Sequence, residues 1–66
     1  MTVFVNEQPL RLFRGANVGD AIMKYSESIF RDILSKRKMV TNAHGKALPL
    51  QEDVHDGDHF MVTGSR

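Results

Sequence analysis

The 66-residue chain has no cysteine, no tryptophan and only two prolines. No disulfide can therefore supplement the core of a chain that, at this length, buries only about 60% of the surface its unfolded form exposes. No apolar run is long enough to cross a membrane, and no signal peptide is recognisable. Nine Lys and Arg against eight Asp and Glu give a net charge of +1, which does not predict nucleic acid as a partner. We expect one cytoplasmic domain over residues 1–66, too small to enclose a substrate.

Turn residues divide the chain into short elements. Residues 2–5 are β-branched or aromatic, and residues 6–8 after them are typical of a tight turn. In residues 10–13, leucine alternates with arginine and phenylalanine, which is the period of a half-buried strand, and Pro9 stands at its start. These two segments are predicted to pair as an antiparallel hairpin.

A helical period follows the hairpin. Apolar side chains recur at three- and four-residue intervals and form one stripe: Val18, Ala21, Ile22, Tyr25, Ile29 and Ile33. Asn17 is placed to cap the helix, and Asp20 can complete a capping box. Phe30 and Leu34 depart from the stripe. The helix is therefore expected to bend, to break near residues 26–28, or to rotate its last turn toward another surface.

Three further strands are predicted in the second half of the chain. Residues 38–41 form the first, and the Asn-Ala-His-Gly sequence at residues 42–45 has the preference of a type I turn. Residues 47–50 are expected to form a short strand that its proline confines to a sheet edge. After an Asp-Gly-Asp turn at residues 56–58, residues 59–63 form the last strand. The order β-β-α-β-β-β predicts an α+β fold in which a mixed sheet packs on one helix.

Three stretches of the sequence resemble a known superfamily: residues 3–8 together with Leu10 and Leu12, residues 15–22 (GANVGDAI) and residues 54–62 (VHDGDHFMV). They are similar to the first hairpin, the capped helix start and the Gly-Asp turn of the β-grasp (ubiquitin-like) superfamily. Within it, the chain most resembles the sulfur-carrier proteins of thiamin and molybdopterin biosynthesis and the TGS-type domains. In the predicted fold the first and last strands are parallel neighbours, and the helix supplies the crossover between them.

The resemblance to sulfur carriers implies a function at the C-terminus. These proteins carry a C-terminal Gly-Gly whose carboxylate an adenylating enzyme activates as an acyl-adenylate, which then becomes a thiocarboxylate. This sequence departs from that pattern, because it reads Thr63-Gly64-Ser65-Arg66 and has a single glycine there. Trimming of Ser65 and Arg66 would expose Gly64, the position that the resemblance assigns to contact with an adenylating enzyme, but would leave Thr63 where the family has glycine.

The two faces of the predicted sheet differ in an informative way. The side facing the helix comprises Val3, Val5, Leu10, Leu12, Phe60 and Val62. Period-2 alternation then turns Phe4 and Met61 to the opposite face, and Arg11 and Phe13 on the adjoining strand point the same way. Such a face is usually polar, whereas Phe, Met and Arg are enriched in protein interfaces. We therefore predict that this patch binds another protein or a second copy of the chain. The alternatives are that the patch is merely small, or that a loop or a crystal or homodimer contact covers it.

One basic cluster stands at the end of the predicted helix: Arg31, Lys36, Arg37 and Lys38. Positive charge suits the carbonyl groups of a helix C-terminus, which accounts for the cluster without a ligand. The resemblance to TGS-type domains makes a phosphate or RNA contact the alternative. No aromatic residue is interleaved for base stacking, so nucleic acid is the weaker expectation.

The remaining polar residues predict neither a metal site nor catalysis. Histidines and aspartates crowd one segment: Asp53, His55, Asp56, Asp58 and His59. They alternate faces across a turn without a cysteine, so we favour a solvated loop over a metal site. Ser26, Ser28 and Ser35 have no His or Asp at a usable spacing, and no glycine-rich phosphate loop is present. We predict a non-catalytic interaction module without a cofactor, with a sulfur carrier or an RNA- or nucleotide-binding module as alternatives.

Overall fold

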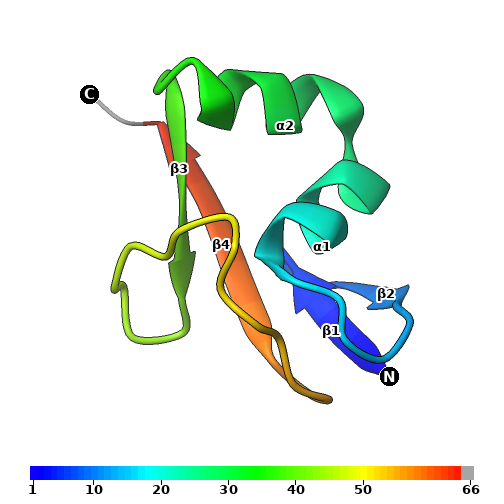
Figure 1. Ribbon diagram of the computed structural model, residues 1–66. Helices are drawn as coiled ribbons and strands as arrows, with labels where there is room; N and C mark the ends of the chain where they lie inside the picture. Colours follow the sequence, from blue (N-terminus) through cyan, green and yellow to red (C-terminus); the bar gives the residue numbers. More distant parts are fainter. Residues whose placement is uncertain (65–66) are drawn as a thin grey trace.

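The computed structural model describes residues 1–64, which form a four-stranded mixed sheet and two helices (Figure 1). The strands are β1 (Thr2–Val5), β2 (Gln8–Arg11), β3 (Lys38–Asn42) and β4 (His59–Gly64), and the helices are α1 (Val18–Tyr25) and α2 (Glu27–Leu34). The strand order is β2-β1-β4-β3, in which β1 and β4 are parallel and both outer pairs are antiparallel. The predicted α+β class and the parallel pairing of the first and last strands are therefore confirmed.

The hairpin is tighter than predicted. Asn6 and Glu7 both have positive φ angles, 49° and 70°, and they alone connect β1 to β2. Two-residue turns of this kind match the right-handed twist of the strands they join. The prediction of a strand over residues 10–13 is thus wrong by two residues at each end. Pairing with β1 begins at Gln8, opposite Val5, and ends at Arg11, opposite Thr2.

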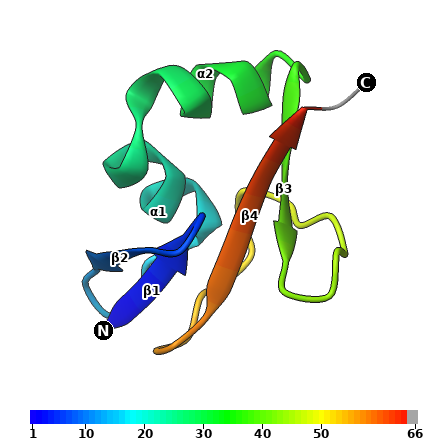
Figure 2. The same ribbon diagram turned by 180° about the vertical axis from the view of Figure 1, so that it is seen from behind.

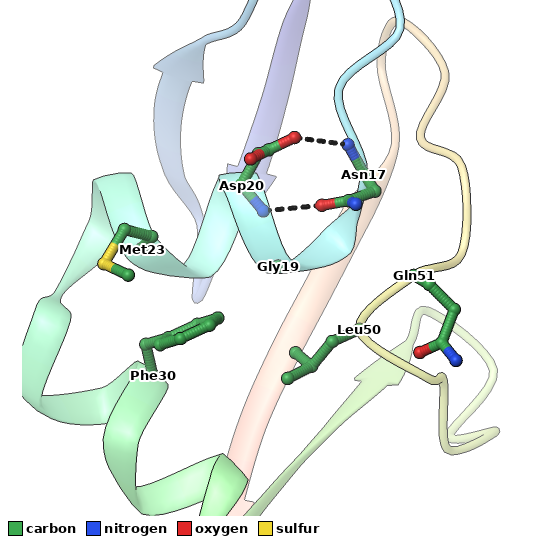
Figure 3. A pocket seen from close by; sticks show the side chains of 7 residues that line it. All are labelled: Asn17, Gly19, Asp20, Met23, Phe30, Leu50 and Gln51. Carbon is green, nitrogen blue, oxygen red and sulfur yellow. Dashed lines mark hydrogen bonds between the residues drawn. The ribbon is translucent and has the colours of Figure 1, made fainter.

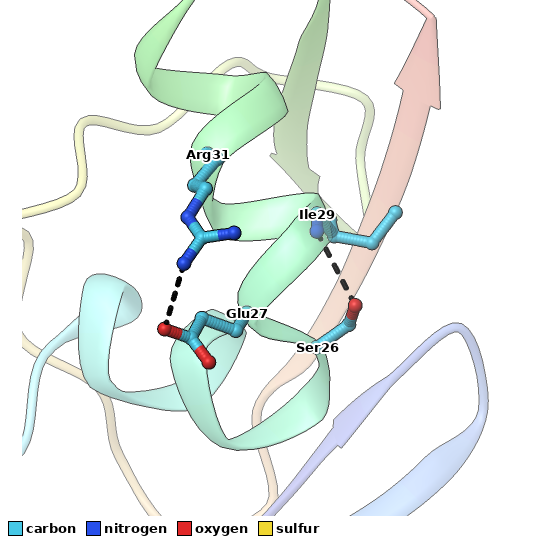
Figure 4. Close-up of polar contacts among 4 residues, drawn as sticks. All are labelled: Ser26, Glu27, Ile29 and Arg31. Carbon is cyan, nitrogen blue, oxygen red and sulfur yellow. Dashed lines mark hydrogen bonds and ion pairs between the residues drawn. The ribbon is translucent and has the colours of Figure 1, made fainter.

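The prediction of one helix is also wrong, because Ser26 separates α1 from α2. Its backbone is extended (φ −166°, ψ 120°), and its N–H donates to the Ile22 carbonyl at the end of α1. Its Oγ accepts a hydrogen bond of 3.2 Å from the Ile29 N–H and so caps α2 (Figure 4). Serine favours such caps over helix interiors. Of the three expectations for this region, a break near residues 26–28 is the one that is confirmed.

The segment after β3 contains the third correction. The turn at residues 42–45 is confirmed by a 3.0 Å hydrogen bond from the Gly45 N–H to the Asn42 carbonyl. The strand expected at residues 47–50 is absent from the described residues, where a single bridge joins Ala47 to Thr41. The chain instead runs beneath the start of α1, and the Leu50 carbonyl accepts the Gly19 N–H at 2.8 Å. It thereby satisfies a helix N–H that has no partner inside the helix.

The core lies between α1 and the sheet. Its buried apolar members are Val3, Val5, Leu10, Leu12, Ala16, Val18, Ala21, Ile22, Val40, Val54 and Phe60. The core predicted on the strands is confirmed except for Val62, which is half-buried, and Tyr25, Ile29 and Ile33 pack at the edge. Viewed from behind, α1 and the segment that leads into β4 lie beyond the sheet, α2 runs beside its upper end, and neither helix lies in front of it (Figure 2). Neither helix therefore covers this face of the sheet. Among residues 1–64, neither helix has the length and apolar character needed to span a bilayer.

Candidate protein-binding surface

The uncovered face of the sheet, here called the outer face, carries the side chains that alternate with the core. Val3 and Val5 are fully buried on the helix side, so Phe4 between them points to the outer face. On β4, Phe60 is buried and Met61 is 41% exposed. The predicted division of these side chains between the two faces is therefore confirmed.

Three side chains on β1 and β4 form the outer-face patch: Phe4, His59 and Met61. Parallel pairing puts Phe4 beside His59, and their rings stack with centroids 4.5 Å apart and planes at 9°. Met61 lies two residues further along β4, on the same face. A hydrogen bond of 2.8 Å from the Phe4 N–H to the Asp58 carbonyl fixes the two strands at this point. The patch is thus an ordered aromatic pair next to an exposed, adaptable methionine.

His59 belongs to this patch although the sequence reasoning assigned it to the acidic loop. The signal that could have found it is the same alternation, because His59 and Met61 are two residues apart on one strand. The sequence analysis predicted that the last strand begins at His59, which is confirmed, but considered this residue only together with the aspartates as a metal site.

Arg11 and Phe13, the other two residues expected on this face, have different positions. Arg11 is exposed and pairs with Thr2. Because the neighbouring pair, Leu10 and Val3, faces the core, Arg11 points to the outer face, as predicted. Phe13 lies beyond the end of β2, where strand alternation no longer applies. It is exposed and lines a depression of about 440 Å³ together with Met23 of α1. The short hairpin turn is the cause, since β2 ends two residues earlier than expected.

Gly64 is the last residue of β4 and pairs with Lys38 of β3. It is exposed, and apart from Gly64 itself and its two chain neighbours, no heavy atom of the described residues lies within 4 Å of the position that a Cβ would take there. The departure from the Gly-Gly pattern at Ser65 and Arg66 lies outside the described residues.

The four basic residues of the predicted cluster are not used alike. Arg31 reaches back along α2 and pairs with Glu27 at 3.1 Å, both side chains being well exposed (Figure 4). Lys36 has a φ angle of 64° in the turn between α2 and β3, and the Arg37 N–H closes that turn on the Asp32 carbonyl at 2.8 Å. Lys38 then begins β3. Three of the four cations therefore share one end of the molecule, and Arg31 is engaged within its own helix.

The aspartates before β4 are occupied by backbone N–H groups. The Asp56 carboxylate accepts the Thr2 N–H and the Asp58 carboxylate accepts the His55 N–H, each at 2.7 Å. Gly57 between them has a φ angle of 88°, which suits a residue without a Cβ. Within residues 1–64, no three His, Asp or Glu side chains come together in a way that could hold a metal ion. These residues shape the turn and attach it to β1.

A depression of about 310 Å³ lies between the start of α1 and Phe30 of α2 (Figure 3). The Asn17 side chain accepts the Asp20 N–H at 2.8 Å and the Asp20 carboxylate accepts the Asn17 N–H at 3.0 Å, which confirms the predicted capping box. A Cβ at Gly19 would stand 3.5 Å from the Phe30 ring. Asp20 is the one ionisable side chain among residues 1–64 that lines this hollow, and it is engaged in the cap.

The chain has no match in three comparisons, with protein-family models, with curated proteins and with solved structures. The strand order and the outer-face patch are the observations on which a function can be based.

Proposed function

We propose that this chain is a small, non-catalytic β-grasp protein that binds another protein through the outer-face patch. The β-grasp assignment is supported by the strand order β2-β1-β4-β3, whose central pair is parallel and joined through helices. The binding function is supported by one observation above all: an ordered aromatic pair and an exposed methionine on a sheet face that neither α1 nor α2 covers.

The composition of the patch suits binding. Phe4 and His59 are already stacked, so little side-chain freedom remains to be lost when a partner covers them. Met61 is flexible and can adjust to a partner's shape. An interface of ordinary size buries about 800 Å² on each side, roughly a fifth of this chain's 4470 Å² of accessible surface.

The test compares two methionines of nearly equal exposure. Met61 is 41% exposed on the outer face, and Met23 is 44% exposed on α1. We expect Phe4→Ser/Met61→Ser to remain folded, with a loss of about 1 kcal/mol from the broken aromatic stack, and to lose its partner or its self-association. Met23→Ser should keep both. Thermal unfolding, sedimentation and pull-down with the purified variants measure these effects.

Val5→Ser provides the opposite control, because Val5 is fully buried on the helix side. A hydroxyl buried there without a partner should unfold a chain with so small a core. If the Phe4/Met61 variant unfolds while Val5→Ser survives, or if Met23→Ser loses the partner equally, the outer face is not the binding surface.

A sulfur carrier remains the second candidate, favoured by the open surroundings of Gly64 at the end of a central strand. Incubation with an adenylating enzyme, ATP and a sulfur donor, followed by intact-mass measurement, tests it. A mass increase equal to the exchange of oxygen for sulfur, on the full or trimmed chain, would place this function first. An unchanged mass leaves the non-catalytic module as the better account.

A further inference from the structure

A second apolar surface lies at the other antiparallel edge of the sheet, far from the hairpin in sequence. It is a groove of about 490 Å³ between the end of α2, the start of β3 and residues 47–50. Within residues 1–64, ten residues line it; eight are apolar, among them Ile33, Leu34 and Leu48, and the other two are Lys36 and Lys38. Leu34, the last residue of α2, is 58% exposed. We call this the β3 groove.

The backbone beside the β3 groove has an open strand edge. The Val40 carbonyl accepts the Leu48 N–H at 3.0 Å and the Asn42 N–H donates to the Lys46 carbonyl at 2.9 Å, so these two residues direct their backbone groups away from β4. By the alternation of an antiparallel ladder, Lys38 does the same. Pro49 has no N–H, and on the edge of β3 that faces away from β4 the described residues form one bridge, between Thr41 and Ala47. An extended segment can therefore hydrogen-bond to β3 at Lys38.

The charge around the groove indicates what such a segment carries. Among residues 1–64, the two polar residues that line the groove are lysines and no Asp or Glu lines it. The charge available to a ligand is that of Lys38 and of the exposed Arg37 beside it. This concentration of positive charge contrasts with a net charge of only +1 for the whole chain. A segment that combines apolar and acidic residues complements both the apolar lining of the groove and the cations beside it.

We propose that the β3 groove binds an extended peptide segment of a partner, composed of apolar residues flanked by Asp or Glu. The apolar side chains enter beside Ile33, Leu34 and Leu48, the peptide backbone pairs with Lys38, and the carboxylates face the Lys38 and Arg37 side chains. This site is separate from the outer-face patch, which lies on β1 and β4. The chain would thus join two partners, one on the sheet face and one at the sheet edge.

The probe is a random dodecapeptide library displayed on phage and panned on the purified chain. Enriched peptides are then synthesised with a fluorescent label, and their affinity is measured by fluorescence polarisation. We expect them to combine apolar residues with Asp or Glu and to bind less tightly as salt is added. Lys38→Glu should weaken them about tenfold or more, the effect of losing one charge-assisted contact, and Leu34→Ser should weaken them as well.

Matched variants separate this site from other surfaces. Lys46→Glu makes the same charge change in the turn after β3, and Met23→Ser makes a similar apolar-to-polar change on α1; both should bind the peptides as the original chain does. Phe4→Ser/Met61→Ser should also retain them, so that failure of this proposal and failure of the outer-face patch are distinguishable. The Lys38→Glu variant keeps the test valid if Leu34→Ser is unstable.

Four results with peptides or with the chain alone would overturn the proposal. They are the absence of enriched peptides, enrichment of peptides without acidic residues, equal binding by Lys38→Glu and the original chain, and a concentration-dependent dimer that Leu34→Ser abolishes. The last would assign the groove to a second copy of the chain. Binding of a single-stranded RNA oligonucleotide that Lys38→Glu abolishes and Leu34→Ser leaves intact would likewise assign the cations to RNA.

Discussion

Removal of the Asn17 side chain tests the beginning of α1 and, with it, the placement of the core. In Asn17→Ala the Asp20 N–H loses its 2.8 Å acceptor, whereas the reciprocal bond from the Asn17 N–H to the Asp20 carboxylate persists because its donor is main chain. The Val18 and Gly19 N–H groups also remain bonded, to the carbonyls of Glu52 and Leu50. The loss is thus one capping bond, worth about 1 kcal/mol.

That loss is large for a chain of this size. A core this small rarely supplies more than about 3–5 kcal/mol, and a loss of 1 kcal/mol lowers the melting temperature of such a domain by about 4–8 °C. Circular dichroism during heating measures the change. Asn17→Ser keeps an acceptor and should melt close to the original chain. Ser26→Ala removes a longer hydrogen bond of 3.2 Å at the start of α2, a helix without fully buried residues. It should therefore lower the melting temperature less than Asn17→Ala does. An unaltered melting temperature in Asn17→Ala, or equal losses in Asn17→Ala and Asn17→Ser, would refute the capping argument.

Two further substitutions test smaller features. Gly57→Ala should lower the free energy of unfolding by about 1–2 kcal/mol through the positive φ of this residue alone, because only atoms of Gly57 and its chain neighbours among the described residues lie within 4 Å of the added Cβ. Gly57→Asn should recover part of that loss. Equal stability of all three chains in thermal unfolding would contradict this reasoning. Glu27→Gln should lower the free energy of unfolding by at most about 0.5 kcal/mol, because the ion pair of Glu27 with Arg31 is well exposed. In urea titrations, this difference should vanish at high salt. A larger loss that does not depend on salt would contradict this weak contribution of the ion pair to stability.

The parts of the fold that follow from local signals were predictable. Asn17 and Asp20 have the spacing of a capping box, and each makes the expected hydrogen bond. Asn42 and Gly45 close the predicted turn. In these cases the donor and the acceptor lie within a few residues of each other, so a pattern of residue types fixes the geometry. The break at Ser26 was foreseen only as one of three outcomes, because a serine cap and a bent helix give the same apolar spacing.

The errors arose where distant segments compete for the same groups. Residues 47–50 have the composition of an edge strand, but the Leu50 carbonyl is needed by the Gly19 N–H, which has no partner inside its helix. Phe13 was placed by counting along a strand whose end depended on the length of the preceding turn. No pattern within either segment contains this information, since each outcome is decided by an element elsewhere in the chain.

The outer-face patch follows from a local pattern, whereas the β3 groove depends on segments that are distant in sequence. The positions of Phe4 and Met61 follow from strand alternation, and His59 could have been added by the same rule. The β3 groove could not be predicted, because its walls come from α2, β3 and residues 47–50, which meet only in the folded chain. The departure of Leu34 from the helical stripe was its one signal in the sequence, since that departure turns the side chain out of the core.

The geometry of the sheet allows both surfaces to be occupied at once. A protein on the outer face approaches perpendicular to the sheet, over β1 and β4, whereas a peptide at the β3 groove adds in the plane of the sheet, along an edge strand. An ordinary interface of about 800 Å² would still leave roughly four-fifths of the 4470 Å² surface uncovered. Because β3 and β4 are hydrogen-bonded along Lys38–Asn42, the relative orientation of the two partners would be set by the sheet rather than by a flexible linker. A chain with so small a core is well suited to that task, which requires a fixed platform and no enclosed cavity.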